Sequence, residues 1–129
     1  MLYIVDTHSL VWFLEGSVKL GSKAREVLED DNSRLIIPTI VLVEVKYLAQ
    51  KGKLLSTFKE IIEAVEGDFR CIVYPLDIQV LEKMPTNLEI HDGIICGTAL
   101  LYHEMGEKEV GIITRDEKII KSGLIKTIW

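Results

Sequence analysis

Short apolar runs alternate along the chain with longer segments in which apolar residues recur at helical spacing. This alternation predicts an α/β fold with a mostly parallel central sheet. Strands are predicted at residues 2–5, 35–37, 71–74, 110–114 and 126–128. Helices are predicted at residues 7–15, 22–30, 38–50, 55–66, 77–84, 91–105 and 117–121, with Pro38 in the first turn of its helix, where proline is tolerated. No repeat, low-complexity tract or linker interrupts residues 1–129, so a single domain is expected.

Four acidic residues interrupt this pattern at positions where an ordinary core would not place a charge. Asp6 directly follows the first apolar run, and Asp116 follows the run at 110–114. Glu44 lies inside the apolar stretch 40–45, and Asp92 precedes the apolar segment 94–96. Charged side chains are rarely buried unless they are paired or bind a metal. Because sites in open α/β sheets form at the carboxyl ends of strands, the four acids suggest one shared cation site.

Each acid, taken alone, also has a structural interpretation. Asp6 and Asp116 precede predicted helices, where aspartate is a favoured N-cap, and Asp92 could complement the positive end of a helix dipole. Glu44 lies in mid-helix among apolar neighbours three and four residues away, so a buried ion pair is its remaining structural explanation. As a set, the four carboxylates suit Mg²⁺ or Mn²⁺, which prefer oxygen ligands and can activate water and orient a phosphate.

Composition narrows the functional classes. The chain is 48% hydrophobic and 27% charged, contains no apolar run approaching the roughly 20 residues that span a membrane, and shows no basic leader, so a cytoplasmic globular protein is expected. Cys71 and Cys96 lie in apolar segments without metal-type spacing and are interpreted as reduced core thiols. The net charge of −5 argues against a broad basic face for nucleic acid, although a nuclease could bind phosphate through its metal ions.

The acid-bearing motifs, in their order along the chain, resemble those of PIN-domain ribonucleases, particularly the VapC-like toxins of bacterial and archaeal toxin–antitoxin pairs. Residues 3–8 are similar to the family's strand followed by an aspartate, and residues 10–12 to the segment after it. Residues 38–44 are similar to the helix that carries the second acid. Asp92 with Ile94, Ile95 and Ala99 is similar to the third motif, and residues 114–116 to the last. The chain departs from the pattern at Gly93, where many of these toxins carry arginine.

This resemblance implies a PIN-like α/β/α sandwich and hydrolysis of RNA phosphodiester bonds. It implies that Asp6, Glu44, Asp92 and Asp116 bind one or two Mg²⁺ or Mn²⁺ ions, with Thr114 as a polar helper. It further implies a cognate antitoxin that sends a basic side chain, most naturally arginine, into the acid cluster. A homodimer is also implied, with residues 39–50 and 55–66 as candidate contacts, although the core needs the same apolar residues.

Two other functions fit parts of the sequence. A haloacid-dehalogenase-like phosphatase would use Asp6 as a nucleophile, but such a nucleophile is usually followed two residues later by another aspartate, where this chain has His8. A catalytically silent PIN-fold binding module has no need of four convergent carboxylates. Other residues have a weaker functional interpretation: the aromatic ones could stack on bases, and the basic ones could contact phosphates. We assign them to packing or to the solvated surface. They are His8, His91, His103, Trp12, Phe13, Tyr47, Lys46, Arg115 and Lys118.

Overall fold

Strand β1 (Leu2–Val5) runs through the middle of a five-stranded sheet, and all of its residues are buried. In the computed structural model, which describes residues 1–129, β1 lies between β2 (Arg34–Pro38) and β4 (Val110–Ile113). Strands β3 (Cys71–Tyr74) and β5 (Lys126–Ile128) form the two edges. Every strand pairing is parallel, which confirms the predicted α/β class and makes the sheet parallel throughout.

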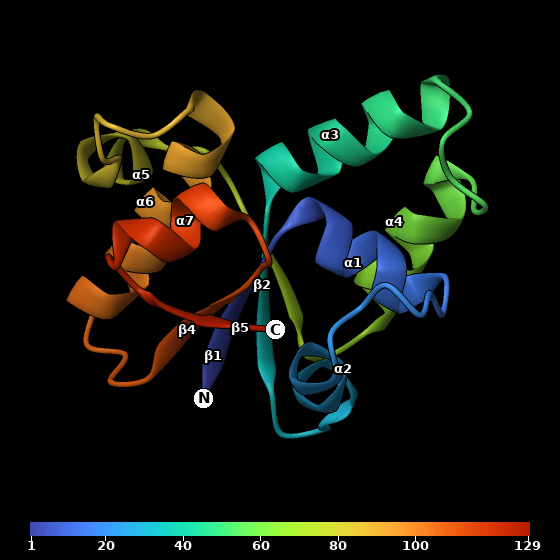
Figure 1. Cartoon of the computed structure of the whole chain (residues 1–129), viewed down its shortest axis with the longest axis horizontal. Coiled ribbons are helices and arrows are strands. Elements are labelled where there is room, and N and C mark those ends of the chain that lie inside the picture. Colours follow the sequence, from blue (N-terminus) through green and yellow to red (C-terminus); the bar gives the residue numbers. More distant parts are fainter.

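Helices cover both faces of the sheet and produce the α/β/α sandwich (Figure 1). One side carries α1 (Thr7–Leu14), α2 (Ser22–Glu29), α3 (Thr39–Gln50) and α4 (Phe58–Gly67), and the other carries α5 (Ile78–Lys83), α6 (Ile90–Glu104) and α7 (Glu117–Ser122). The chain adds β2 and β3 on one side of β1, and then β4 and β5 on the other. Right-handed crossovers therefore place the two groups of helices on opposite faces. None of the helices combines the length and apolar character needed to span a membrane.

The strand order β3-β2-β1-β4-β5 changes direction between β1 and β4. These neighbours pair in register from Leu2 with Val110 to Val5 with Ile113, and the Asp6 N–H donates to the Ile113 carbonyl at 3.3 Å. The segments that follow β1 and β4 consequently leave the sheet side by side. Such a change of direction, at the carboxyl ends of parallel strands, is where open α/β sheets bind ligands.

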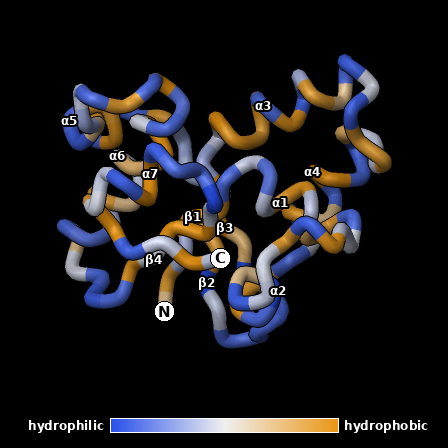
Figure 2. Tube along the Cα trace, viewed as in Figure 1, coloured by the Kyte–Doolittle hydropathy of each residue, from blue (hydrophilic) through white to orange (hydrophobic).

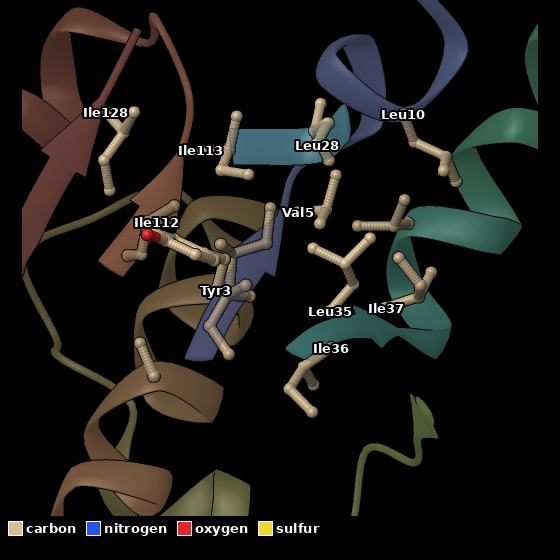
Figure 3. Close-up of a cluster of buried hydrophobic side chains, with 14 of the residues drawn as sticks. Tyr3, Val5, Leu10, Leu28, Leu35, Ile36, Ile37, Ile112, Ile113 and Ile128 are labelled. Atoms are coloured by element: carbon tan, nitrogen blue, oxygen red, sulfur yellow. The ribbon is translucent and has the colours of Figure 1, made fainter. Parts of the chain in front are cut away.

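The hydrophobic core fills the space between the sheet and the helices. Figure 2 shows hydrophobic segments in the central strands and hydrophilic segments at the outer turns. The strands contribute the fully buried Ile36, Ile37 and Ile112 to this core, and the helices contribute Leu10 of α1 and Leu28 of α2 (Figure 3). Because both faces of the central strands are covered, these strands are continuous apolar runs in the sequence. The core thus provides a rigid frame for the residues at the ends of the strands.

Most predicted boundaries agree with the structure within a residue or two, and the differences have local causes. Pro38 is extended (φ −60°, ψ 140°), ends β2 and precedes α3, so its prediction in the first helical turn was wrong. Helix α4 begins at Phe58, three residues later than predicted. Its start is fixed by a capping box, in which Thr57 Oγ1 accepts from the Glu60 N–H (3.1 Å) and Glu60 Oε1 accepts from the Thr57 N–H (2.9 Å).

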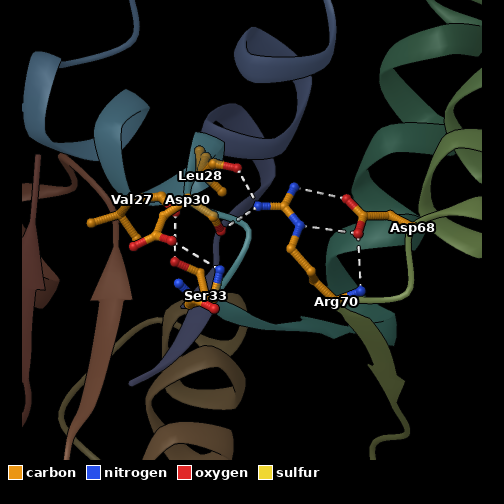
Figure 4. A network of polar contacts seen from close by, with 7 residues as sticks. Val27, Leu28, Asp30, Ser33, Asp68 and Arg70 are labelled. Atoms are coloured by element: carbon orange, nitrogen blue, oxygen red, sulfur yellow. Dashed lines mark hydrogen bonds and ion pairs between the residues drawn. The ribbon is translucent and has the colours of Figure 1, made fainter.

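One arginine fastens the end of α2 to the start of β3 (Figure 4). Nη1 of Arg70 donates to the carbonyls of Leu28 (2.7 Å) and Asp30 (2.8 Å), while Nε and Nη2 donate to the two carboxylate oxygens of Asp68 (3.1 and 2.8 Å). The Arg70 side chain is only 10% exposed. Its hydrogen bonds hold the pKa of the Asp68 carboxyl below the usual value. This network uses the planar fork of arginine, which lysine lacks.

Replacing Arg70 with lysine is therefore expected to lower the free energy of unfolding by about 1–2 kcal/mol, because the charge remains while several hydrogen bonds are lost. Urea denaturation of both proteins measures the difference. Arg34→Lys is the matched control, since Arg34 pairs only with Glu107 and its side chain is 51% exposed. The control should change by less than about 0.5 kcal/mol. Equal losses in the two variants would show that the carbonyl contacts of Arg70 add no stability.

Candidate active site

A cleft of about 490 Å³ opens at the carboxyl ends of β1 and β4, and all four of the predicted acids line it. Asp6 follows β1, Glu44 comes from the middle of α3, Asp92 from the first turn of α6, and Asp116 from the residue before α7. The other lining residues are Thr7, His8, Glu89, His91, Ile95, Glu117 and Lys118. Acids from four separate elements thus meet in this acid cleft, which lies at the switch point of the sheet.

Asp6 and Asp116 are helix caps and cleft residues at the same time. Asp6 Oδ1 accepts the Ser9 N–H at 2.9 Å at the start of α1. Asp116 Oδ1 accepts the N–H groups of Lys118 (2.9 Å) and Ile119 (3.3 Å) at the start of α7. In both residues the helix cap uses Oδ1. The capping interpretation and the ligand interpretation are therefore compatible, because the cap takes up one of the two oxygens of each carboxylate.

Glu44 is oriented by a hydroxyl rather than by a buried cation. Thr7, only 5% exposed, donates its hydroxyl to Glu44 Oε1 at 2.9 Å. Glu44 Oε2 lies 4.0 Å from Nδ1 of His91, and the Glu44 side chain is 31% exposed. The buried ion pair considered for Glu44 is therefore absent. Its carboxylate reaches the cleft from α3, and Thr7 fixes its direction.

Asp92 is the least compensated of the four acids, because no hydrogen bond to its carboxylate is found. Burial, together with the charges of Asp116, Glu89 and Glu44, raises the pKa of Asp92 to about 6, with Lys118 acting in the opposite direction. Burial also raises the pKa of Asp6, but hydrogen bonds from Ser9 and Thr114 offset part of that effect. Three neighbouring carboxylates thus disfavour ionisation of Asp92, in addition to its burial.

The sequence did not single out Glu89, which also lines the acid cleft. Glu89 caps α6, since its Oε2 accepts the N–H groups of His91 (3.1 Å) and Asp92 (3.4 Å). Its Oε1 lies 3.3 Å from Nδ1 of His91. Glutamate is not a preferred cap, so the available signal was its spacing of one helical turn before Asp92. With Glu117, the cleft holds six carboxylates and a single ammonium group, that of Lys118.

Thr114 and Gly93, which the sequence also singled out, lie outside the lining of the acid cleft. Thr114 is fully buried, does not line the cleft, and accepts the Asp116 N–H with its hydroxyl at 3.0 Å. It supports the backbone of Asp116 from below. A Cβ atom on Gly93 would lie 3.3 Å from Cε of Met84 and 3.6 Å from the Pro85 carbonyl oxygen. Position 93 therefore faces the segment between α5 and α6, and a long side chain there would displace Met84.

The donor atoms of the acid cleft suit a hard divalent cation, because all four predicted ligands offer carboxylate oxygens. The carboxylates lie farther apart than the ligands of a bound metal ion do. No group of three or more histidine, cysteine, aspartate or glutamate side chains converges closely enough to hold an ion. The donor chemistry fits, and binding requires the carboxylates to draw together. Mutual repulsion of the charged groups opposes their approach, and a bound cation would offset it.

Comparison with known proteins agrees with this geometry. The model of the PIN domain family matches residues 3–123. A crystal structure of VapBC2 from Rickettsia felis, bound to a DNA fragment from their promoter, is 16% identical with a TM-score of 0.70, and the match covers 98% of this chain and 97% of that chain. VapBC-1 from nontypeable Haemophilus influenzae is 18% identical with a TM-score of 0.64, covering 98% and 96%.

No curated protein sequence gives a significant match to the chain. The two structural similarities concern the fold, since both identities are low. The family match is of a different kind, because it is a match of the sequence itself to a family model, and its residues 3–123 include Asp6, Glu44, Asp92 and Asp116. The chain therefore belongs to the PIN domain family.

Proposed function

We propose that this protein is a divalent-metal-dependent endoribonuclease that hydrolyses RNA phosphodiester bonds and acts as the toxin of a toxin–antitoxin pair. The observation that carries the proposal is the meeting of Asp6, Glu44, Asp92 and Asp116 in one cleft at the switch point of a PIN fold. A cleft with six carboxylates repels a phosphodiester unless a cation is present. The excess of negative charge thus favours metal-dependent chemistry.

The four acids would hold one or two Mg²⁺ or Mn²⁺ ions, which prefer the oxygen ligands that these side chains offer. A bound ion supplies an activated water and stabilises the charge that develops on the phosphate. The protein contributes orientation. The cap bonds of Asp6 and Asp116 and the Thr7 hydroxyl fix three of the carboxylates, and Lys118 brings a positive charge to the cleft for the substrate phosphate.

The protein partner is proposed to be an antitoxin that inhibits the enzyme by inserting an arginine into the acid cleft. A guanidinium matches carboxylates bidentately, so it would compete directly with the metal ion. Both structural relatives are VapBC assemblies, which supports a partner of this kind. Inhibition by such a partner should weaken as the Mg²⁺ concentration rises.

A homodimer is proposed to form through α3 rather than through α4. Val43 and Tyr47 of α3 are 60% and 54% exposed, whereas Ile61 and Val65 of α4 are buried in the core. The apolar face of α4 is therefore buried inside the protein and is not available for a contact between two subunits. Sedimentation of the purified chain at micromolar concentration tests the dimer, and a monomer there would contradict it.

The phosphatase alternative is disfavoured by PIN membership and by the lack of a second aspartate at position 8, where His8 lies exposed. The silent-module alternative is tested by activity. The purified chain, incubated with single-stranded RNA, should produce internal cleavage with Mg²⁺ or Mn²⁺ and none with excess EDTA. Sequencing of the cleaved ends identifies the sites, and an Asp6→Asn control purified in parallel excludes a contaminating nuclease. Cleavage that persists in EDTA or in the control would overturn the proposal.

Thr7 offers a test of how the site is assembled. Thr7→Val removes the hydroxyl that orients Glu44 while keeping the size of the side chain. Partners that orient a metal ligand typically affect affinity or activity about 10- to 100-fold, so we expect the Mg²⁺ concentration for half-maximal cleavage to rise by about tenfold. Thr7→Ser, which keeps a hydroxyl, should remain close to wild type. Equal behaviour of the valine and serine variants would show that Glu44 does not depend on this hydrogen bond.

A further inference from the structure

A second cleft, of about 260 Å³, adjoins the acid cleft and shares Asp6, His8 and Asp116 with it. Its remaining lining residues are Trp12, Arg115 and Trp129, and we call it the tryptophan cleft. The chain has two tryptophans, so both are found here. A strand that enters the acid cleft therefore has the tryptophan cleft directly beside it.

The aromatic rings of the tryptophan cleft form a fixed arrangement. The His8 and Trp12 ring centroids lie 5.2 Å apart, and those of Trp12 and Trp129 lie 5.9 Å apart at 68°. Trp129 packs directly on Gly21, where a Cβ atom would come within 2.6 Å of the Trp129 backbone and ring. Both indoles are half-buried: each packs against the hydrophobic core and is partly accessible to solvent. The rings are thus held in place before any ligand arrives.

Arg115 adds an unpaired cation to these rings. Its guanidinium carbon lies 4.6 Å from the Trp12 centroid and 5.9 Å from that of Trp129. Arg115 is exposed and has neither an ion pair nor a side-chain hydrogen bond, although Asp6 and Asp116 line the same cleft. A guanidinium stacked on an aromatic face keeps its edge donors available, and these suit bidentate contact with a phosphate. The cleft therefore combines a stacking surface with a phosphate-binding group.

We propose that the tryptophan cleft is a base subsite, which takes one unstacked base of single-stranded RNA beside the phosphodiester in the acid cleft. The base stacks on the indole of Trp129, or on that of Trp12 in place of the Arg115 guanidinium, and Arg115 contacts the adjoining phosphate. This inference rests on the proposed ribonuclease function. The cleft volume lies below the roughly 300–1,000 Å³ of sites for drug-sized ligands, so it suits one base and not a longer segment.

Stacking would also give this acidic protein affinity for RNA. With a net charge of −5, the chain has little general attraction for a polyanion. Stacking on aromatic side chains provides binding that does not depend on net charge and that tolerates any base. Bases in a duplex are paired and stacked on one another, so the tryptophan cleft selects single strands.

Intrinsic fluorescence reports on the proposed subsite, because both tryptophans lie in it. The full chain carrying Asp92→Asn, in which cleavage is expected to be slow, is titrated in Mg²⁺ with a short single-stranded RNA oligonucleotide. Parallel titrations use oligonucleotides with one abasic nucleotide at each position in turn. We expect the intact strand to quench fluorescence, and one abasic position to remove the quenching and to weaken binding about 5- to 150-fold.

Substitutions separate stacking from packing. Trp12→Phe keeps an aromatic face and should retain most of the affinity, whereas Trp12→Leu should lose about as much as the abasic strand. Arg115→Gln should weaken binding of intact and abasic strands alike, because it acts on a phosphate. Phe69→Leu, at a side chain 86% exposed between α4 and β3, is the matched aromatic control and should leave binding unchanged. Thermal unfolding verifies that each variant is folded. If Trp12→Leu does not fold, the abasic series and Arg115→Gln still test the proposal.

The outcomes distinguish this inference from the function on which it rests. Metal-dependent cleavage without any position-dependent abasic effect would overturn the base subsite and leave the ribonuclease proposal intact. An abasic effect at one position in a protein that cleaves no RNA with Mg²⁺ or Mn²⁺ would retain the subsite and refute the nuclease. Quenching by an arginine-rich peptide but not by RNA would assign the tryptophan cleft to a protein partner and overturn the proposal.

Discussion

Asn in place of Asp92 is expected to lower Mg²⁺-dependent RNA cleavage by about three orders of magnitude while leaving the fold intact. An ion bound at such a site contributes several kcal/mol to transition-state stabilisation, and each 1.4 kcal/mol is about a factor of ten in rate. Asp92 is the acid with no hydrogen bond to its carboxylate, so its replacement disturbs no cap and no side-chain hydrogen bond. Initial rates of cleavage of a labelled RNA strand measure the effect, with circular dichroism to verify the fold.

The same loss is expected for Asp6→Asn, Glu44→Gln and Asp116→Asn, and the losses should not add when two are combined. Residues that act as one unit fail together, so a double variant should be about as inactive as either single variant. Glu117→Gln is the matched control, because Glu117 lines the cleft and pairs with Lys121 while lying outside the four predicted ligands. Full activity in two of the four ligand variants would refute a shared metal site.

The sequence was sufficient to predict the fold because its apolar runs are unambiguous. Residues 2–5 are apolar without alternation, as a strand buried on both faces requires, and the structure places β1 in the middle of the sheet. Residues 71–74 were also predicted as a strand, although Ile72 and Val73 are partly exposed at the edge. The start of α4 was missed because the apolar Leu55 suggested a helical residue, whereas the capping box at Thr57 decides the start.

The candidate site was partly predictable for a different reason. Asp6 and Asp116 could be placed at strand ends from the sequence, but their proximity depends on the pairing of β1 with β4, which no local pattern specifies. Thr7 and Glu89 escaped notice because their roles rest on contacts with Glu44 and His91. Trp12 and Trp129 lie at opposite ends of the sequence, so their shared cleft with Arg115 became visible only in three dimensions.

Neutralising Asp92 is expected to have the opposite effect on stability to its effect on activity. In metal-free protein at about pH 8, Asp92→Asn should raise the free energy of unfolding. The pKa of Asp92 is about 6 in the folded protein, against about 3.9 in an unfolded chain. Two units of pKa correspond to about 3 kcal/mol, and solvent screening of this half-buried carboxylate reduces the expected gain to about 1–2 kcal/mol. The midpoint of thermal unfolding should rise by about 3–8 °C.

The sign of the pH dependence follows from the raised pKa. Below about pH 4, Asp92 is protonated in the folded and the unfolded states, so it carries no penalty and the variant should match wild type. Between about pH 4 and 6 the unfolded chain releases a proton that the folded protein retains, and the wild type loses stability as the pH rises. Above about pH 7 the carboxylate is ionised in both states, and the whole penalty remains.

Thermal melts in EDTA from about pH 4 to 8 therefore test the penalty that burial and the neighbouring carboxylates place on ionised Asp92. Glu82→Gln, an exposed residue of α5 without an ion pair or a side-chain hydrogen bond, is the charge-matched control and should change stability by less than about 0.5 kcal/mol at every pH. Adding Mg²⁺ at pH 8 should reverse the order of the proteins. An ion that binds the folded state stabilises it by mass action, and the wild type retains the carboxylate that the variant lacks. A constant difference between the two proteins across this pH range would show that ionisation of Asp92 is not its cause.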